Sequence, residues 1–288
     1  MKRDVNISAS VKARLKNKAR EENRPFNDLL QLYGIERFLY RLSLSDYADQ
    51  FVLKGALMLL TLDLPSLRPT RDIDLLGYTE NGVSHILKIF QEISSVDVEA
   101  DGIVFDANGM SATRIKEDAD YAGVRVNFYG YLGKALIPIQ IDIGFSDVLT
   151  PASVPVKYPT LLSLLPAPQI SGYPLETIVA EKLQAMIFLG RVNSRMKDFY
   201  DIWMLIKNFD FDSRILEKAI TRTFQHRNTL IPKGIPVAFT DAFAQEKEKQ
   251  WKAFLKRNKL MDVSFDFNLV VTDLRVFFIP CFQRILGV

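Results

Sequence analysis

The pattern of hydrophobic and polar positions changes about halfway along the chain. In the first half the apolar runs are short, and in the clearest of them Ile137, Ile139, Ile141 and Ile143 occupy every second position, as in a β-strand. In the second half the apolar positions recur every three or four residues, as on one face of a helix. The sequence therefore predicts an α+β protein, in which a mixed or antiparallel β-sheet is followed by a helical C-terminal part.

The same periodicities give bounds for the individual elements. In the first half we expect a helix capped by Ser8 and Ser10, a helix opened by Pro25 and Asn27, a strand, glycine and helix within 51–60, a helix at 81–93, and strands at 71–76, 102–105, 111–115, 124–131 and 135–145. In the second half we expect helices at 175–189, 194–207, 213–224, 241–258 and 267–286. The Pro- and Ser-rich stretch 150–174 is interpreted as a linker or an irregular crossover. This organisation predicts a first domain at 1–165 and a helical domain at 166–288.

Sulfur and imidazole groups are scarce in this chain. The 288 residues include one cysteine, Cys281, and two histidines, which excludes an intramolecular disulfide and a cysteine zinc cluster and argues against a Ser-His-Asp triad. Any chemistry must therefore rest on carboxylates, lysines and arginines. The net charge of +3 permits a nucleic-acid partner without requiring one.

Neither a signal peptide nor a membrane span is apparent in the sequence. The first 24 residues are charged and lack the apolar core of a signal peptide. No uncharged run reaches the length of about 18 residues that a membrane-spanning helix needs. We therefore expect a cytoplasmic protein that does not enter a membrane. The sequence does not reveal the oligomeric state, and a monomer is the default expectation.

Two carboxylates lie two positions apart on a predicted strand. Because side chains alternate along a strand, Asp72 and Asp74 project from the same face, while Ile73 and Leu75 point into a core. Two adjacent carboxylates repel each other, and a hard cation such as Mg²⁺ relieves that repulsion. For so short a pattern taken alone, a polar strand edge or a solvated turn is the commoner explanation.

A third carboxylate strengthens the metal-binding interpretation. Asp142 lies in the isoleucine-rich strand, on the face opposite the isoleucines, where an aspartate is costly unless it is paired or metal-bound. If the two strands are neighbours, Asp72, Asp74 and Asp142 form a cradle for one or two Mg²⁺ or Mn²⁺ ions that bridge the phosphates of an NTP. Such a cradle serves phosphoryl or nucleotidyl transfer.

A glycine precedes these aspartates at a predicted strand-to-helix turn. Gly55 allows backbone N–H groups to approach a phosphate, and Lys54 adds a positive charge beside it. Glycine turns are common, so this signal depends on the aspartates that follow. Lys54, Gly55 and Ala56, together with Arg71, are our candidates for nucleotide binding in this half of the chain.

A lysine interrupts the apolar stripe of the helix predicted at 175–189. Lys182 lies on that stripe, where it must reach out to solvent, pair with an acid or face a site, and we expect it to hold the triphosphate. Asp198, in the next helix, could orient Lys182, act as a base, or form a structural salt bridge. Asp201 is expected to be structural, and Arg195 to contact a nucleotide or RNA phosphate or to cover the surface.

A basic helix face in the last third of the chain offers a weaker signal. Four lysines repeat there at helical spacing, opposite apolar residues: Lys249, Lys252, Lys256 and Lys259. This face could bind RNA electrostatically, but charged helix faces are more often simply solvated.

Four segments of the chain together resemble one family. They are Leu53-Lys54-Gly55-Ala56, Arg71-Asp72-Ile73-Asp74-Leu75, Ala180-Glu181-Lys182-Leu183 and Lys197-Asp198-Phe199-Tyr200-Asp201. In order and spacing they resemble the AbiEii/AbiGii/MenT nucleotidyltransferase toxin family, over about residues 10–209. One departure is Ala56, where the family usually has glycine or serine, so a hydroxyl contact to phosphate is lost while the backbone N–H remains.

The resemblance implies a fold and an activity. The family has a DNA-polymerase-β-like nucleotidyltransferase core, and its characterised members are toxins of toxin–antitoxin or phage-defence systems. Some of them add nucleotides to the 3′ end of tRNA. The resemblance implies that Asp72 and Asp74 bind metal with Asp142 as the third carboxylate, that Lys182 handles the NTP, and that Asp198 is essential. A cognate antitoxin protein is a further implied partner.

Two other classes of function stay open at this point. The same fold could transfer a nucleotide to a protein or a small molecule, and label from an NTP would then enter a different cellular fraction. Alternatively the chain could be a non-catalytic module that binds RNA or protein. The retained aspartates and Lys182 argue against that second class, because a binding module has no need for clustered carboxylates.

Overall fold

The computed structural model describes residues 2–62, 64, 68–117, 121–260 and 266–288. They divide into two compact units. The first comprises Met1–Leu62, Thr70–Ser146 and Val154–Gly172, and the second comprises Asp63–Pro69, Asp147–Ser153 and Tyr173–Val288. Residues 166–172 therefore lie in the first unit, although the sequence suggested a boundary after residue 165. The second unit also takes two short segments from within the first.

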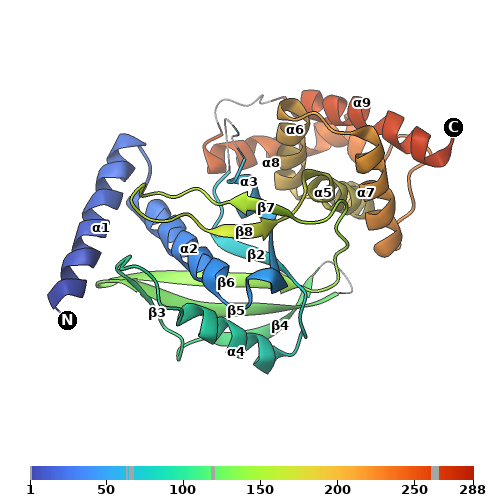
Figure 1. Ribbon diagram of the computed structural model, residues 1–288. Helices are drawn as coiled ribbons and strands as arrows, with labels where there is room; N and C mark the ends of the chain where they lie inside the picture. The colour runs from blue at the N-terminus through green and yellow to red at the C-terminus, as the bar shows by residue number, and fades with distance from the viewer. Residues whose placement is uncertain (1, 63, 65–67, 118–120, 261–265) are drawn as a thin grey trace. The chain divides into compact units, whose positions relative to one another are not determined.

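The first unit is built on a mixed sheet, in which the described residues form eight strands (Figure 1). The order is β3-β5-β6-β2-β1-β8-β7, with β4 paired to β5. The strands are β1 (Phe51–Lys54), β2 (Asp72–Gly77), β3 (Ile103–Phe105), β4 (Ser111–Glu117), β5 (Tyr121–Leu132), β6 (Ala135–Gly144), β7 (Val154–Lys157) and β8 (Gln169–Gly172). β2 runs parallel to β6 and antiparallel to β1, so the predicted mixed sheet is confirmed.

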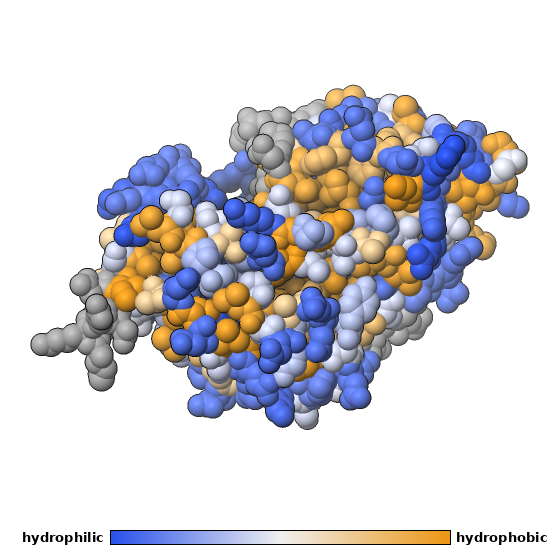
Figure 2. Space-filling view, in the orientation of Figure 1, coloured by the Kyte–Doolittle hydropathy of each residue, from blue (hydrophilic) through white to orange (hydrophobic). Residues whose placement is uncertain are grey.

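Helices cover one face of this sheet. The helices of the unit are α1 (Lys2–Glu21), α2 (Phe26–Leu44), α3 (Gly55–Leu59) and α4 (Val83–Ser94). Phe38 of α2 stacks on Phe90 of α4 and contacts Phe128 of β5, so α2 and α4 pack on the same face as the isoleucines of β6. α1 presents a hydrophilic surface (Figure 2). On the opposite face of the sheet, the strands β4, β5, β6 and β2 carry polar side chains, including Asp74 and Asp142.

Two predictions for this unit were wrong. The stretch 150–174, expected to be a linker or an irregular crossover, contains β7 and β8, and β8 pairs in parallel with β1. Each of these strands has only four residues, which is too few to show an alternating pattern. They form because they pair with strands that are distant in the sequence or with each other. The first helix begins at Lys2, before the expected caps, and the Ser8 hydroxyl donates instead to the carbonyl of Gly102.

The second unit contains the predicted C-terminal helices. They are α5 (Leu175–Leu189), α6 (Met196–Asn208), α7 (Ser213–His226), α8 (Asp241–Asn258) and α9 (Phe267–Leu286). Stacked aromatic rings join α6, α8 and α9, with Trp251 on Phe267 and Phe199 on Phe243. The prediction of an α+β protein with a helical C-terminal part is therefore confirmed. In the described part of the chain, no helix is both long and apolar enough to cross a membrane.

Candidate active site

A row of polar side chains crosses the exposed face of the sheet over five strands. The register pairs Lys54 with Asp74, Asp74 with Asp142, Asp142 with Arg125, and Arg125 with Thr113. Residues opposite each other in register project from the same face. The structure thus places Asp74 and Asp142 side by side on parallel strands, as the three-aspartate hypothesis requires.

The alternation along β2 aims its two aspartates at this face. Ile73 and Leu75 are fully buried, whereas Asp74 is half-buried and Asp72 is exposed. Asp72 lies opposite Gln140, one pleat away from Asp142. The apolar positions of β2 fix its register, because a shift by one residue would bury both carboxylates.

A glycine lies against one of these carboxylates. Gly55 has a φ of +69°, and a Cβ at this position would overlap the Asp74 carboxylate. It opens α3, with Lys54 at the N-cap and Ala56 in the first turn. Lys54 and Ala56 are buried, and Arg71 is exposed and pairs with Asp28. The turn therefore brings the backbone close to Asp74, as expected from the sequence.

Sequence reasoning missed an arginine in this row. Arg125 donates from Nε and Nη2 to the two oxygens of Asp142, at 2.7 Å each. These hydrogen bonds raise the pKa of Arg125, and the charges of Asp72 and Asp74 raise it further. The β5–β6 hairpin turns at Gly133-Lys134, and counting back in register from this turn brings Arg125 opposite Asp142.

The donor set of this face suits a hard cation only in part. Asp72 and Asp74 supply the one or two carboxylates by which Mg²⁺ is commonly held when substrate phosphates complete its coordination. Both oxygens of Asp142, by contrast, accept hydrogen bonds from Arg125. Within the described ranges, no group of three or more His, Cys, Asp or Glu side chains is arranged to hold a metal. Asp72 and Asp74 therefore fit a metal ion, and Asp142 as the third ligand stays a prediction.

The second unit holds the other predicted residues in one ionic cluster. The Lys182 ammonium donates to Asp198 at 3.0 Å and to Asp201 at 2.8 Å. Arg195 lies 2.6 Å from the second oxygen of Asp198, and Arg68 donates to both oxygens of Asp201 at 2.9 and 3.0 Å. The pairing of Lys182 with an acid, one of the alternatives considered, is therefore present. Arg68 had no signal in the sequence, because its loop has no periodicity.

Burial and charge shift the pKa values of this cluster in opposite directions. Burial alone would lower the pKa of Lys182, but Asp198 and Asp201 outweigh it and the pKa is raised. Burial alone would raise the pKa of Asp201, but Lys182 and Arg68 outweigh it and the pKa is lowered. Both groups are therefore charged at neutral pH. A cluster with this net positive charge can attract a phosphate.

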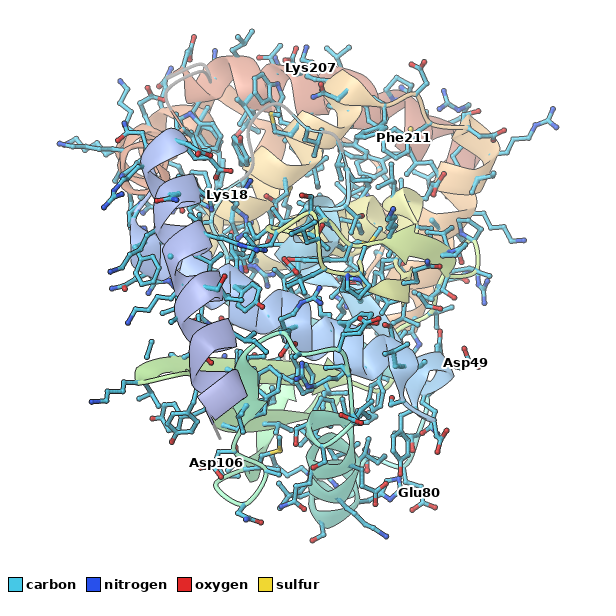
Figure 3. The ribbon with its side chains drawn as sticks, turned by 60° about the vertical axis from the view of Figure 1, so that its left-hand side comes forward. Lys18, Asp49, Glu80, Asp106, Lys207 and Phe211 are labelled. Carbon is cyan, nitrogen blue, oxygen red and sulfur yellow. The ribbon has the colours of Figure 1, made fainter. Side chains whose placement is uncertain are left out.

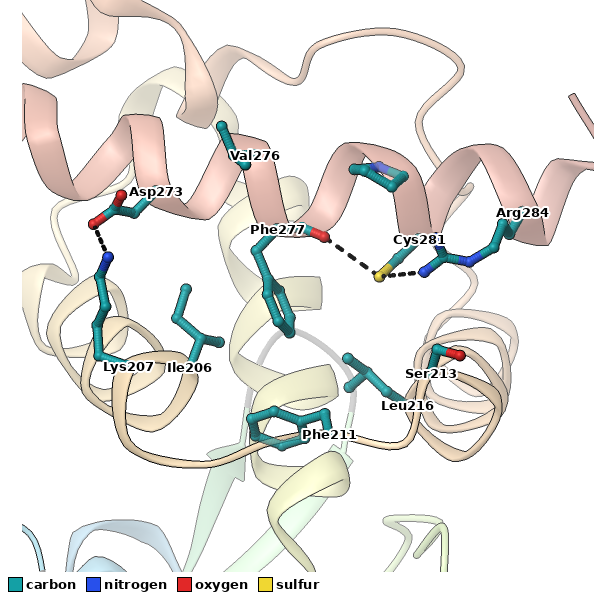
Figure 4. Close-up of a pocket in the computed structure, with 11 residues that line it drawn as sticks. Ile206, Lys207, Phe211, Ser213, Leu216, Asp273, Val276, Phe277, Cys281 and Arg284 are labelled. Atoms are coloured by element: carbon teal, nitrogen blue, oxygen red, sulfur yellow. Dashed lines mark hydrogen bonds and ion pairs between the residues drawn. The ribbon is translucent and has the colours of Figure 1, made fainter.

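A cavity elsewhere in the second unit contains none of the predicted residues. It has a volume of about 420 Å³ and lies among α6, α7 and α9 (Figure 4). Phe211 and Phe277 line it, and Lys207 pairs with Asp273 at its edge. The thiol of Cys281 donates to the carbonyl of Phe277. Burial raises the pKa of that thiol, so it is not a reactive thiolate.

Carboxylates on one face of a mixed sheet, beside a glycine turn, are an arrangement that suits nucleotidyl transfer. The family model of the AbiEii nucleotidyl transferase toxins, which act in type IV toxin–antitoxin systems, matches residues 37–271. The chain therefore belongs to the AbiEii family of nucleotidyl transferase toxins. No curated protein matches it.

Two solved structures are similar to the chain at low identity. JHP933 from Helicobacter pylori is 14% identical, with a TM-score of 0.47, over 87% of this chain and 90% of that one. A protein from H. pylori proposed to be a nucleotidyltransferase is 15% identical, with a TM-score of 0.46, over 87% of this chain and 93% of that one.

Proposed function

We propose that this enzyme transfers a nucleoside monophosphate from an NTP to an RNA acceptor, and that the acceptor is the 3′ end of tRNA. The observation that carries the proposal is the row in which Asp74 and Asp142 lie in register on adjacent strands, with Asp72 one pleat away. The family is one of toxins, and loss of functional tRNA is a direct way to stop growth. The mildly basic chain, with a net charge of +3, is compatible with this acceptor.

Three aspartates, Lys54 and Gly55 have roles in the first unit. Asp72 and Asp74 would hold Mg²⁺ or Mn²⁺, which when bound neutralises the NTP phosphates and lowers the pKa of the attacking hydroxyl. Asp142 would join them as third ligand or accept the proton of that hydroxyl. Gly55, which lies against Asp74, would offer its backbone N–H to a phosphate oxygen, beside the charge of Lys54.

The ionic cluster of the second unit supplies the remaining roles. An ammonium has three N–H donors, and Lys182 directs two of them to Asp198 and Asp201. Its third donor would bind a phosphate oxygen of the NTP. Asp198 would position Lys182, and Arg195, which is one-third exposed, would contact nucleotide or RNA phosphate.

The test is nucleotide transfer by purified protein. Total tRNA is incubated with Mg²⁺ and each α-³²P-labelled NTP in turn, with EDTA as the metal-free condition. We expect label in tRNA from wild type and none from Asp74→Asn, which keeps the size of the side chain but removes its charge. Asp97→Asn is the matched control, because Asp97 is exposed and lies outside the polar row.

The outcomes separate the remaining alternatives. Label in protein or in a small molecule would replace the RNA acceptor but keep the reaction class. Equal labelling by wild type and Asp74→Asn would contradict the assignment of the site. Co-expression with proteins encoded beside the chain would show whether an antitoxin neutralises it by direct binding.

A further inference from the structure

The exposed face of the sheet continues beyond the carboxylates. One pleat from the Asp74–Asp142 pair, the register places Asn127 opposite Gln140, and Gln140 opposite Asp72. Further along the same face, Tyr129 lies opposite Pro138 and Tyr131 opposite Leu136. We call these six residues of β5 and β6 the outer strip: Asn127, Gln140, Tyr129, Pro138, Tyr131 and Leu136.

A cavity lies between the outer strip and Asp72. It has a volume of about 400 Å³ and is lined by Asp72, by the amides Asn127 and Gln140, by Tyr129 and by Gln31 of α2. The turn after β3 forms another wall, where Asp106 (labelled in Figure 3) accepts a hydrogen bond from the backbone N–H of Gly109. This hollow is large enough for a nucleobase with its ribose, and its amides can donate and accept hydrogen bonds.

Beyond the cavity the strip becomes aromatic and apolar. Tyr129, Tyr131 and Leu136 are 45%, 38% and 51% exposed, and they lie toward the hairpin turn that joins β5 to β6. The helices α2 and α4 pack on the opposite face of the sheet. Two exposed tyrosines two positions apart on one strand form a surface on which successive bases can stack.

Positive charge borders the strip at the end nearest the carboxylates. Arg71 lines the cavity and its side chain is 73% exposed. Arg125 lies one pleat from Asn127 on the same face and is 38% exposed. Guanidinium groups at this position can contact the phosphates of a strand whose bases lie on the tyrosines.

We propose that the outer strip binds the single-stranded 3′-terminal segment of the acceptor RNA, with its last nucleotide in the cavity beside Asp72. This rests on the proposed function, since it takes RNA as the acceptor. The tyrosines stack on unpaired bases further from the 3′ end, and Asn127 and Gln140 bind the terminal base or ribose. The strip would thereby direct the terminal hydroxyl toward the carboxylates and disfavour duplex ends, whose bases are not available for stacking.

Direct binding tests this proposal without any turnover. Fluorescence anisotropy would measure affinity for a labelled single-stranded RNA of about 12 nucleotides and for a duplex of the same length, without NTP. Tyr129→Ala should weaken single-strand binding at least about fivefold, the lower end of what one stacked base contributes. Tyr129→Phe should bind like wild type, because it keeps the ring. Tyr78→Ala is the matched control, since Tyr78 is 55% exposed at the other end of β2.

The results separate this proposal from the proposed function. The transfer assay would be run on the same variants, and Tyr129→Ala should raise KM for tRNA while leaving KM for NTP unchanged. If wild type labels tRNA but Tyr129→Ala keeps the wild-type RNA affinity, the strip is not the acceptor site and the function stands. If wild type labels only protein and binds no single-stranded RNA, both proposals fail. Equal affinity of wild type for single strand and duplex would also overturn the strip proposal.

Discussion

Arg125 and Asp142 form a two-point ion pair across the β5–β6 hairpin, with both oxygen distances at 2.7 Å. The pair lies within the row that carries the catalytic candidates, and Asp74 is opposite Asp142 on the other side. A cation that uses Asp142 must therefore compete with a guanidinium already in place. In the absence of a metal, Arg125 compensates the repulsion among carboxylates that would otherwise lie side by side.

Replacement of Arg125 should make the fold more dependent on a metal ion. Arg125→Gln removes the compensating charge, so we expect a lower Tm in EDTA and a larger rise in Tm on addition of Mg²⁺ than for wild type. The pair is partly exposed, at 38% and 15%, so its own contribution to stability is about 0–1 kcal/mol. Thermal unfolding with and without Mg²⁺ measures both effects.

An arginine on the neighbouring strand provides the control for this experiment. Arg114 is exposed and contacts Asn81 at 3.3 Å, outside the polar row. Arg114→Gln should therefore respond to Mg²⁺ as wild type does. Identical Mg²⁺ responses of Arg125→Gln and wild type would show that Asp142 does not take part in cation binding.

The strand and helix patterns were enough to predict most of the fold. α5, α8 and α9 have the predicted bounds. In each of them apolar residues recur every three or four positions over the whole length, and only a helix brings residues at that spacing onto one face. The alternation along β6 likewise placed Asp142 on the exposed face. β7 and β8 could not be found this way, since Gln169–Gly172 is too short to show a period and becomes a strand through its pairing with β1.

The candidate site was predictable where its residues lie within one element. Asp72 and Asp74 share a face by alternation, whereas the contact of Lys182 with Asp198 depends on how two helices pack. Arg68 lies in an aperiodic loop, so its pairing with Asp201 follows only from tertiary structure. Whether Lys182 and Asp198 also bind nucleotide remains a prediction.

Gly55 should not tolerate a methyl group. Gly55→Ala places a Cβ onto the Asp74 carboxylate and holds alanine at a φ of +69°, which costs about 1 kcal/mol or more in strain alone. We expect a lower Tm and a loss of nucleotide transfer, because Asp74 must move. Urea unfolding and the tRNA labelling assay measure the two effects.

A substitution at Gly190 separates the effect of backbone strain from the effect of a clash with Asp74. It has a φ of +48°, and a Cβ there would meet nothing within 4 Å. Gly190→Ala should therefore lose stability through backbone strain and keep its activity. If the two variants lose transfer to the same extent, the close approach of Gly55 to Asp74 has no special role in the site.

The ionic cluster of the second unit should make stability depend on pH at both extremes. The pKa of Asp201 is lowered from 3.8, so its contribution is complete above that value and is lost as the pH falls through the folded pKa. The pKa of Lys182 is raised from 10.5, so its contribution is complete below that value and is lost as the pH rises through the folded pKa. Between these limits Asp201 and Lys182 are both charged and their contribution is constant.

Asp201→Asn should reveal this dependence as a difference from wild type. Without the Asp201 carboxylate, the buried positive charges of Lys182 and Arg68 lose a neutralising partner. We therefore expect the free energy of unfolding to fall by about 3 kcal/mol at neutral pH. In urea unfolding the difference from wild type should be flat near neutrality and shrink below pH 3.8. Glu246→Gln, which breaks exposed ion pairs with Arg191 and Lys247, should cost much less than Asp201→Asn, because solvent screens both pairs. A cost for Asp201→Asn as small as that of Glu246→Gln would mean that the cluster is not a structural element of the helical unit, and that its charges are held for a ligand alone.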